Sequence, residues 1–207
     1  MFMSASRGEG TSSIAASFSL MTAARARQAT WLIDLSLEGN TQLEAFDNGF
    51  SFDTGRPGRA YDASLDVRPF YDVMQMGKRA PVAPRRNRKL LTAHQIGGTR
   101  LLVTGFRQNH IQYGERISFS SRAGWWTKLR QSADWIIVDA PALEASKDAL
   151  KVVPNMDGVV IVVRSDATAI DQVQMLKSEV EQADGHILGI VMNQVSGDAL
   201  IADKLAG

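Results

Sequence analysis

Six short apolar runs recur along the chain. None shows the strict alternation of apolar and polar residues that marks a strand with one wet face. Each run therefore predicts a strand that is buried on both faces, as in a parallel sheet. The predicted strands are residues 1–4, 31–35, 101–104, 135–138, 159–163 and 187–192.

Helical patterns separate most of these runs. The first helical segment, residues 12–28, is rich in Ala, Ser and Met, and the last, residues 167–183, carries apolar residues at helical spacing. The predicted helices are residues 12–28, 124–132, 144–153 and 167–183. Such alternation predicts an α/β fold, with a mostly parallel central sheet, right-handed crossovers and helices on both faces.

Residues 39–98 break this pattern. They are rich in Gly, Pro, Asn and Asp, and only residues 67–76 predict a helix there. The segment also contains a basic run at residues 84–89, Pro-Arg-Arg-Asn-Arg-Lys. Such a run is typical of a solvated surface loop, and the alternative is a contact for an acidic partner or for lipid headgroups.

Composition narrows the choice of function. A chain of 207 residues that is 44% hydrophobic can bury one sizeable core, so residues 1–207 are predicted to form one domain. The net charge of +1 gives no reason to expect nucleic acid as a partner. The lack of cysteine excludes disulfides and thiolate metal sites and suits a reducing compartment.

No apolar run approaches the roughly 20 residues that cross a bilayer. Residues 1–4 are too short for a signal peptide and resemble the second half of a buried strand, so we expect the chain to begin inside a longer protein. The expected compartment is the cytoplasm.

A glycine-containing loop at residues 4–13 follows the first predicted strand and precedes a long helix. Gly8 and Gly10 let the backbone approach a phosphate closely, and the helix start directs N–H groups and a positive dipole end toward it. Ser12 then occupies the place of the hydroxyl that holds Mg²⁺ in a P-loop. The alternative is an ordinary strand-to-helix turn.

Two later strands each end in an acid, Asp34 and Asp139. In open α/β sheets ligands bind at the carboxyl ends of the strands. Two carboxylates beside a phosphate loop are suited to hold Mg²⁺ through water or to orient an attacking group. The alternative is that each carboxylate caps a turn.

Residues 7–13, Arg-Gly-Glu-Gly-Thr-Ser-Ser, resemble the Pro-Gly-Glu-Gly-Lys-Ser-Thr loop of the bacterial tyrosine kinases of capsule and exopolysaccharide systems. Residues 32–37 and 137–141 resemble the two acidic motifs of that family, and residues 146–149, 156–163 and 187–193 follow in the family's order. The similarity covers about residues 1–37 and 99–195 and implies a three-layer P-loop NTPase-like domain. It implies nucleotide-binding residues Gly8, Glu9, Gly10, Thr11, Ser12, Ser13 and Asn193 (at the adenine ring), metal-binding residues Ser12, Asp34 and Asp139, and catalytic residues Asp34 and Asp139.

The departures from the family concern catalysis. Thr11 replaces the lysine that bridges the β- and γ-phosphates, Ala5 replaces the first glycine, and Ser36 replaces the second carboxylate of the first acidic motif. The last twelve residues contain no tyrosine that could be autophosphorylated, and the upstream helix through which family members form rings is not in this chain.

The resemblance therefore implies a kinase-like protein that is catalytically weak or inactive. Its candidate cofactors are ATP or ADP with Mg²⁺, with weak or absent binding expected. It would act in exopolysaccharide or capsule production through a membrane-embedded co-polymerase or export protein, at the inner membrane, and a homo-oligomer is a further candidate assembly.

Two other functions stay open. An active ATPase or tyrosine kinase could use Arg7, Arg164 or a partner's lysine as a substitute cation. A dinucleotide-binding domain would use Gly8, Gly10 and Ser13 with Asp34 as the ribose-binding acid, although the third position of that fingerprint is normally glycine.

Other chemistry has no support in the sequence. The three histidines lack metal-ligand spacing, and no Gly-x-Ser-x-Gly hydrolase motif is present. The pair Trp125-Trp126 is predicted to anchor the core.

Overall fold

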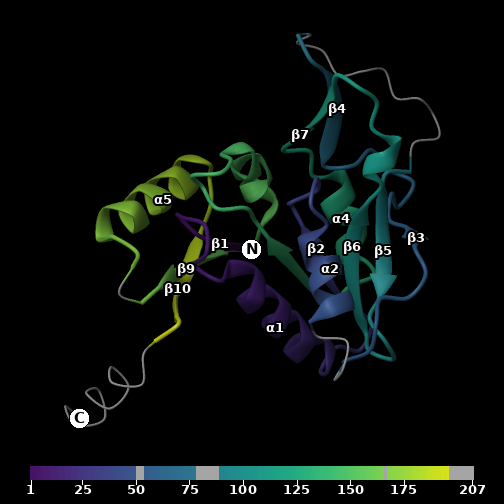
Figure 1. Ribbon diagram of the computed structural model, residues 1–207, viewed down its shortest axis with the longest axis horizontal. Helices are drawn as coiled ribbons and strands as arrows, with labels where there is room; N and C mark the ends of the chain where they lie inside the picture. Colours follow the sequence, from purple (N-terminus) through teal and green to yellow (C-terminus); the bar gives the residue numbers. More distant parts are fainter. Residues whose placement is uncertain (50–53, 78–88, 166, 196–207) are drawn as a thin grey trace.

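A mixed eight-stranded sheet runs through the protein, as the computed structural model in Figure 1 shows. The structure describes residues 1–49, 54–77, 89–165 and 167–195. Along the sheet the strands are β10 (Ile187–Asn193), β9 (Val159–Arg164), β1 (Phe2–Met3), β8 (Trp135–Asp139), β2 (Thr30–Asp34), β6 (Leu101–Phe106), β5 (Leu91–Gln95) and β3 (Tyr61–Asp62). The first six are parallel to one another, whereas β5 pairs antiparallel with β6 and β3 antiparallel with β5.

All six predicted strands are therefore confirmed, and they form the parallel part of the sheet. A separate two-stranded antiparallel sheet joins β4 (Tyr71–Gln75) to β7 (Glu115–Phe119). The helices are α1 (Thr11–Ala23), α2 (Thr41–Asn48), α4 (Gly124–Arg130) and α5 (Ile170–Gln182), with 3-10 helices η1 (Gln108–His110) and η2 (Asp148–Asn155).

Two hydrophobic clusters lie on opposite faces of the main sheet. In β2, Leu32 packs with residues of α1 and α2, whereas its neighbours Trp31 and Ile33 pack with residues of α4, η2 and α5. Successive side chains of a strand point to opposite faces, so the two clusters are the two sides of one sheet. The predicted three-layer α/β architecture is confirmed.

The Trp pair lies in the core, as predicted. Trp125 and Trp126 are both fully buried, and their rings lie 4.9 Å from the ring of Phe70. The helix predicted over residues 67–76 is wrong, because this segment forms β4 instead. The burial of Phe70 against the tryptophans and the five-residue pairing with β7 outweigh a weak local preference for helix.

The remaining predicted helices are confirmed with shifted ends, except that residues 148–155 form the 3-10 helix η2, which contains Pro154. Of the basic run, residues 84–88 lie outside the described residues, and Lys89 forms an ion pair with Asp62 at 2.6 Å. Within the described part of the chain, no helix is long and apolar enough to cross a membrane.

Candidate nucleotide site

The glycine-containing loop leads from β1 into α1, and the backbone N–H groups of its second half are open. Gly8 and Gly10 both have positive φ, at +81° and +85°, and Gly10 is the N-cap of α1. The N–H groups of residues 8–13 donate to no described residue, and the first turn of α1 carries neither a side-chain cap nor an acidic residue. This loop therefore fits the shape and polarity of a phosphate group.

Glu9 maintains the loop from within. It is only 4% exposed, and its Oε2 accepts hydrogen bonds from the backbone N–H groups of Ala5 at 3.1 Å and Ser6 at 3.3 Å. Its Oε1 accepts a short hydrogen bond from the Thr168 hydroxyl. The Glu9 side chain thus belongs to the loop's internal support.

Asn193, at the end of β10, is tied to the same loop. Its Nδ2 donates to the carbonyl oxygen of Glu9 at 3.0 Å. The close packing requires glycine at position 10, because a Cβ there would lie 2.0 Å from Asn193 Nδ2. The amide keeps a second N–H and its oxygen for other partners, and the contact with an adenine ring that the resemblance implies stays a prediction.

Asp34 lies at the carboxyl end of β2, where its carboxylate accepts hydrogen bonds from the following loop and from the start of α2. Oδ1 accepts from the Ser36 N–H at 2.7 Å, and Oδ2 accepts from the Thr41 hydroxyl and the Gln42 N–H, both at 3.0 Å. Burial raises the pKa of Asp34, and these hydrogen bonds oppose the rise. Oδ2 therefore holds the first turn of α2, and the metal-binding and catalytic roles of Asp34 stay predictions.

Asp139 ends β8 in a drier position. Oδ2 accepts a hydrogen bond from Gln42 Nε2 at 2.6 Å, and Oδ1 is shielded from solvent with no partner among the described residues. Burial raises the pKa of Asp139 to about 6. The hydrogen bond from Gln42 lowers this pKa, the nearby Asp34 carboxylate raises it further, and a hydrogen bond from Ser12 lowers it. The structure thus brings Ser12, Asp34 and Asp139 together, as predicted.

Gln42 is a residue of this site that the sequence did not reveal. It is 1% exposed, and its Nε2 donates both to Asp139 and to the carbonyl oxygen of Ser12, the latter at 2.9 Å. It lies in α2, within the segment that matches no motif. Its contact with Asp139 spans 97 positions, so no local pattern marks it.

The position of the P-loop lysine contains no cation. Thr11 is 7% exposed, and its hydroxyl has no hydrogen-bond partner among the described residues. The candidate substitutes, Arg7 and Arg164, are both exposed, and their side chains form no hydrogen bond or ion pair within the part of the chain that the structure describes. Both arginines thus remain available as substitute cations.

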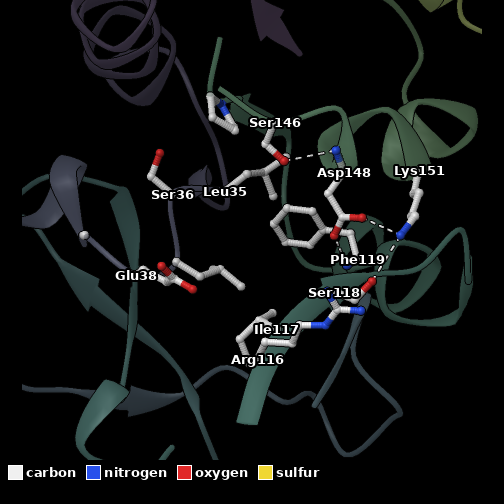
Figure 2. A pocket seen from close by; sticks show the side chains of 13 residues that line it. Leu35, Ser36, Glu38, Arg116, Ile117, Ser118, Phe119, Ser146, Asp148 and Lys151 are labelled. Carbon is white, nitrogen blue, oxygen red and sulfur yellow. Dashed lines mark hydrogen bonds and ion pairs between the residues drawn. The ribbon is translucent and has the colours of Figure 1, made fainter. Parts of the chain in front are cut away.

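A cavity of about 510 Å³ opens next to the site. Figure 2 shows Ser36 and Glu38, from the loop after β2, on one side, and Arg116 of β7 and Lys151 of η2 on the other. Lys151 donates to Ser118 at 3.0 Å and forms an ion pair with Asp148, so these contacts fix the Lys151 side chain at the wall of the cavity. At the cavity's edge Ser36 presents a hydroxyl where the resemblance expects a carboxylate.

These residues fit a phosphate better than they fit a hydrated Mg²⁺. All three hydrogen bonds to Asp34 come from its own loop and α2, and an amide nitrogen lies against Asp139.

No protein-family model matches the chain, and no curated protein matches its sequence. Solved structures do match. The kinase domain of VpsO is 18% identical with a TM-score of 0.63, over 95% of this chain and 84% of that one. The kinase domain of the Escherichia coli tyrosine kinase Etk is 18% identical with a TM-score of 0.58, over 94% and 69%.

A nucleotide-binding protein from Archaeoglobus fulgidus, solved in complex with ADP, is 15% identical with a TM-score of 0.50, over 99% of this chain and 76% of that one. The chain therefore has the fold of these kinase and nucleotide-binding domains, and the three-layer P-loop NTPase-like fold that the resemblance implies is confirmed.

Proposed function

We propose that this chain is a kinase-like P-loop protein that transfers no phosphoryl group and acts as a regulatory or scaffolding subunit. The observation that carries the proposal is Thr11, a buried, uncharged residue in the place of the P-loop lysine. That lysine stabilises charge on the β- and γ-phosphates during transfer. Its loss from a water-excluded site removes on the order of several kcal/mol of transition-state stabilisation.

The acidic residues support the same proposal. A carboxylate that assists transfer must be available to the metal, the water or the acceptor. Asp34 instead accepts hydrogen bonds through Oδ1 from the following loop and through Oδ2 from the first turn of α2, and Ser36 supplies only a hydroxyl. Nucleotide binding is proposed from the open loop and the ADP-bound structural neighbour, and it is expected to be weak.

The biological role rests on the motif resemblance. We propose that the protein serves exopolysaccharide or capsule production, on the cytoplasmic side of the inner membrane, by docking on a membrane-embedded co-polymerase or export protein. Deleting the gene should reduce the amount of polysaccharide. An unchanged amount would contradict this role.

Calorimetric titration with Mg-ATP tests the site. The natural protein should bind weakly or not at all, and Thr11→Lys should bind at least ten-fold more tightly. Ser17→Lys places the same charge on an exposed position of α1 and serves as the control. Equal affinity of all three proteins would argue against Thr11 as the cause of weak binding.

A second candidate is an active ATPase or kinase that uses Arg7 or Arg164, since both are exposed and unpaired within the described chain. Turnover of ATP that disappears in Arg7→Gln or Arg164→Gln would favour it. A dinucleotide-binding domain is less consistent with the sheet order. Such domains place their first two strands side by side, whereas β8 lies between β1 and β2 here.

A further inference from the structure

The first turn of α2 covers the end of the phosphate loop. The Thr41 hydroxyl and the Gln42 N–H both donate to Asp34 Oδ2, at 3.0 Å each, so Asp34 fixes where α2 begins. This arrangement places the Gln42 side chain between Ser12 of α1 and Asp139 at the end of β8. Gln42 is therefore a buried part of the candidate nucleotide site.

The Gln42 amide lies where a metal ion would approach. Its Nε2 is 2.6 Å from Asp139 Oδ2 and 2.9 Å from the carbonyl oxygen of Ser12. Both hydrogens of this NH₂ group therefore point at oxygens around the predicted metal-binding residues. The positive end of an amide dipole repels a cation, and here it satisfies the same carboxylate that a metal-bound water would contact.

The Gln42 amide already occupies two oxygens around the predicted metal-binding residues, Asp139 Oδ2 and the Ser12 carbonyl oxygen. Asp139 Oδ1 and Gln42 Oε1 are both shielded from solvent and have no partner among the described residues. Mg²⁺ keeps several waters and needs near-octahedral geometry, so its entry would require Gln42 to leave both hydrogen bonds. The phosphate loop itself needs no such change, because the N–H groups of residues 8–13 are already open.

We infer that Gln42 is a specificity-determining residue that excludes divalent metal, so the loop takes phosphate groups of a nucleoside diphosphate or pyrophosphate in their metal-free form. This inference rests on the proposed function for the assignment of the loop as a phosphate site. It is separate from the absence of phosphoryl transfer, which follows from Thr11.

Calorimetric titrations of ADP and pyrophosphate, each in EDTA and in excess Mg²⁺, test the inference. The informative variant is Gln42→Met, which keeps the side-chain volume and removes the amide with its N–H donors and its oxygen. Gln172→Ala is the matched control, since Gln172 Nε2 also bonds to the loop, at Ser6 Oγ, but touches neither carboxylate. Thermal unfolding of each variant checks that it is folded.

The natural protein and Gln172→Ala should bind both ligands no more tightly with Mg²⁺ than in EDTA. Gln42→Met should gain at least a ten-fold preference for the Mg²⁺ form. A ten-fold Mg²⁺ preference of the natural protein, or a Gln42→Met variant without one, would overturn the inference. Failure of every protein to bind either ligand would also overturn it, while the proposed absence of phosphoryl transfer would stand and would fail only on measured turnover.

Discussion

The carboxyl group of Asp139 should destabilise the folded protein at neutral pH. Burial raises its pKa from 3.8 to about 6, so the native state binds the proton more tightly than the unfolded state does. Between these two values the native state holds more protons, and the free energy of unfolding falls as the pH rises. At about 1.4 kcal/mol per unit, the full effect above pH 6 is roughly 3 kcal/mol.

Asp139→Asn removes this ionisation and keeps an oxygen that can accept from Gln42. The new amide N–H has no acceptor at the place of Oδ1, which costs about 1–2 kcal/mol. The variant should therefore be more stable than the natural protein at pH 8, by about 1–2 kcal/mol. For a chain of this length, that corresponds to a rise in Tm of roughly 2–8 °C.

Urea unfolding at pH 5 and pH 8 measures the effect. The stabilisation by Asp139→Asn should be larger at pH 8 by about 1 kcal/mol, since the native carboxyl is largely protonated at pH 5. The control is Asp171→Asn, which makes the same substitution at an exposed position of α5. If Asp139→Asn destabilises the protein equally at both pH values, the raised pKa of a buried Asp139 is refuted.

Three further predictions concern the loop and the core. Gly10→Ala should lower the free energy of unfolding by about 2–3 kcal/mol, because its Cβ would collide with the amide of Asn193. Gly8 has a similar φ but open space around it, so Gly8→Ala should cost about 1 kcal/mol, and equal losses in urea unfolding would contradict the close packing at Gly10. Glu9→Ala should expose the loop N–H groups that it now holds, and amide hydrogen exchange there should accelerate at least ten-fold; unchanged exchange would argue against this support. Trp125→Phe should cost about 1 kcal/mol more than Trp126→Phe in urea unfolding, because among the described residues only the Trp125 indole N–H has an acceptor. The reverse order would be inconsistent with the observed bonding.

The sequence predicted the parallel half of the fold because each strand there is a continuous apolar run. Trp31 and Leu32 lie in opposite clusters, and both are buried. A strand buried on both faces has apolar residues at successive positions, and this pattern can be recognised in the sequence. The antiparallel strands were missed because β5, Leu-Thr-Ala-His-Gln, carries no comparable signal. β4 was mistaken for a helix because its partner, β7, lies about forty residues away.

The site was predicted to a similar extent. The glycines and the strand-terminal acids have fixed places in chain order, so Gly10, Asp34 and Asp139 were found from spacing. The roles of Glu9 and Gln42 depend on which groups the folded chain brings within hydrogen-bonding distance of them. Both are ordinary polar residues in the sequence, and only the structure distinguishes Glu9 as a loop support and Gln42 as a buried contact of Asp139.

The most direct test of the central claim is phosphate release from Mg-ATP by the natural protein, measured beside Ser12→Ala. Ser12 occupies the P-loop hydroxyl position, so any turnover at this site should depend on it. We expect both proteins to release phosphate at the same rate as buffer alone. A rate above buffer that Ser12→Ala abolishes would contradict the account and would establish a working enzyme despite Thr11.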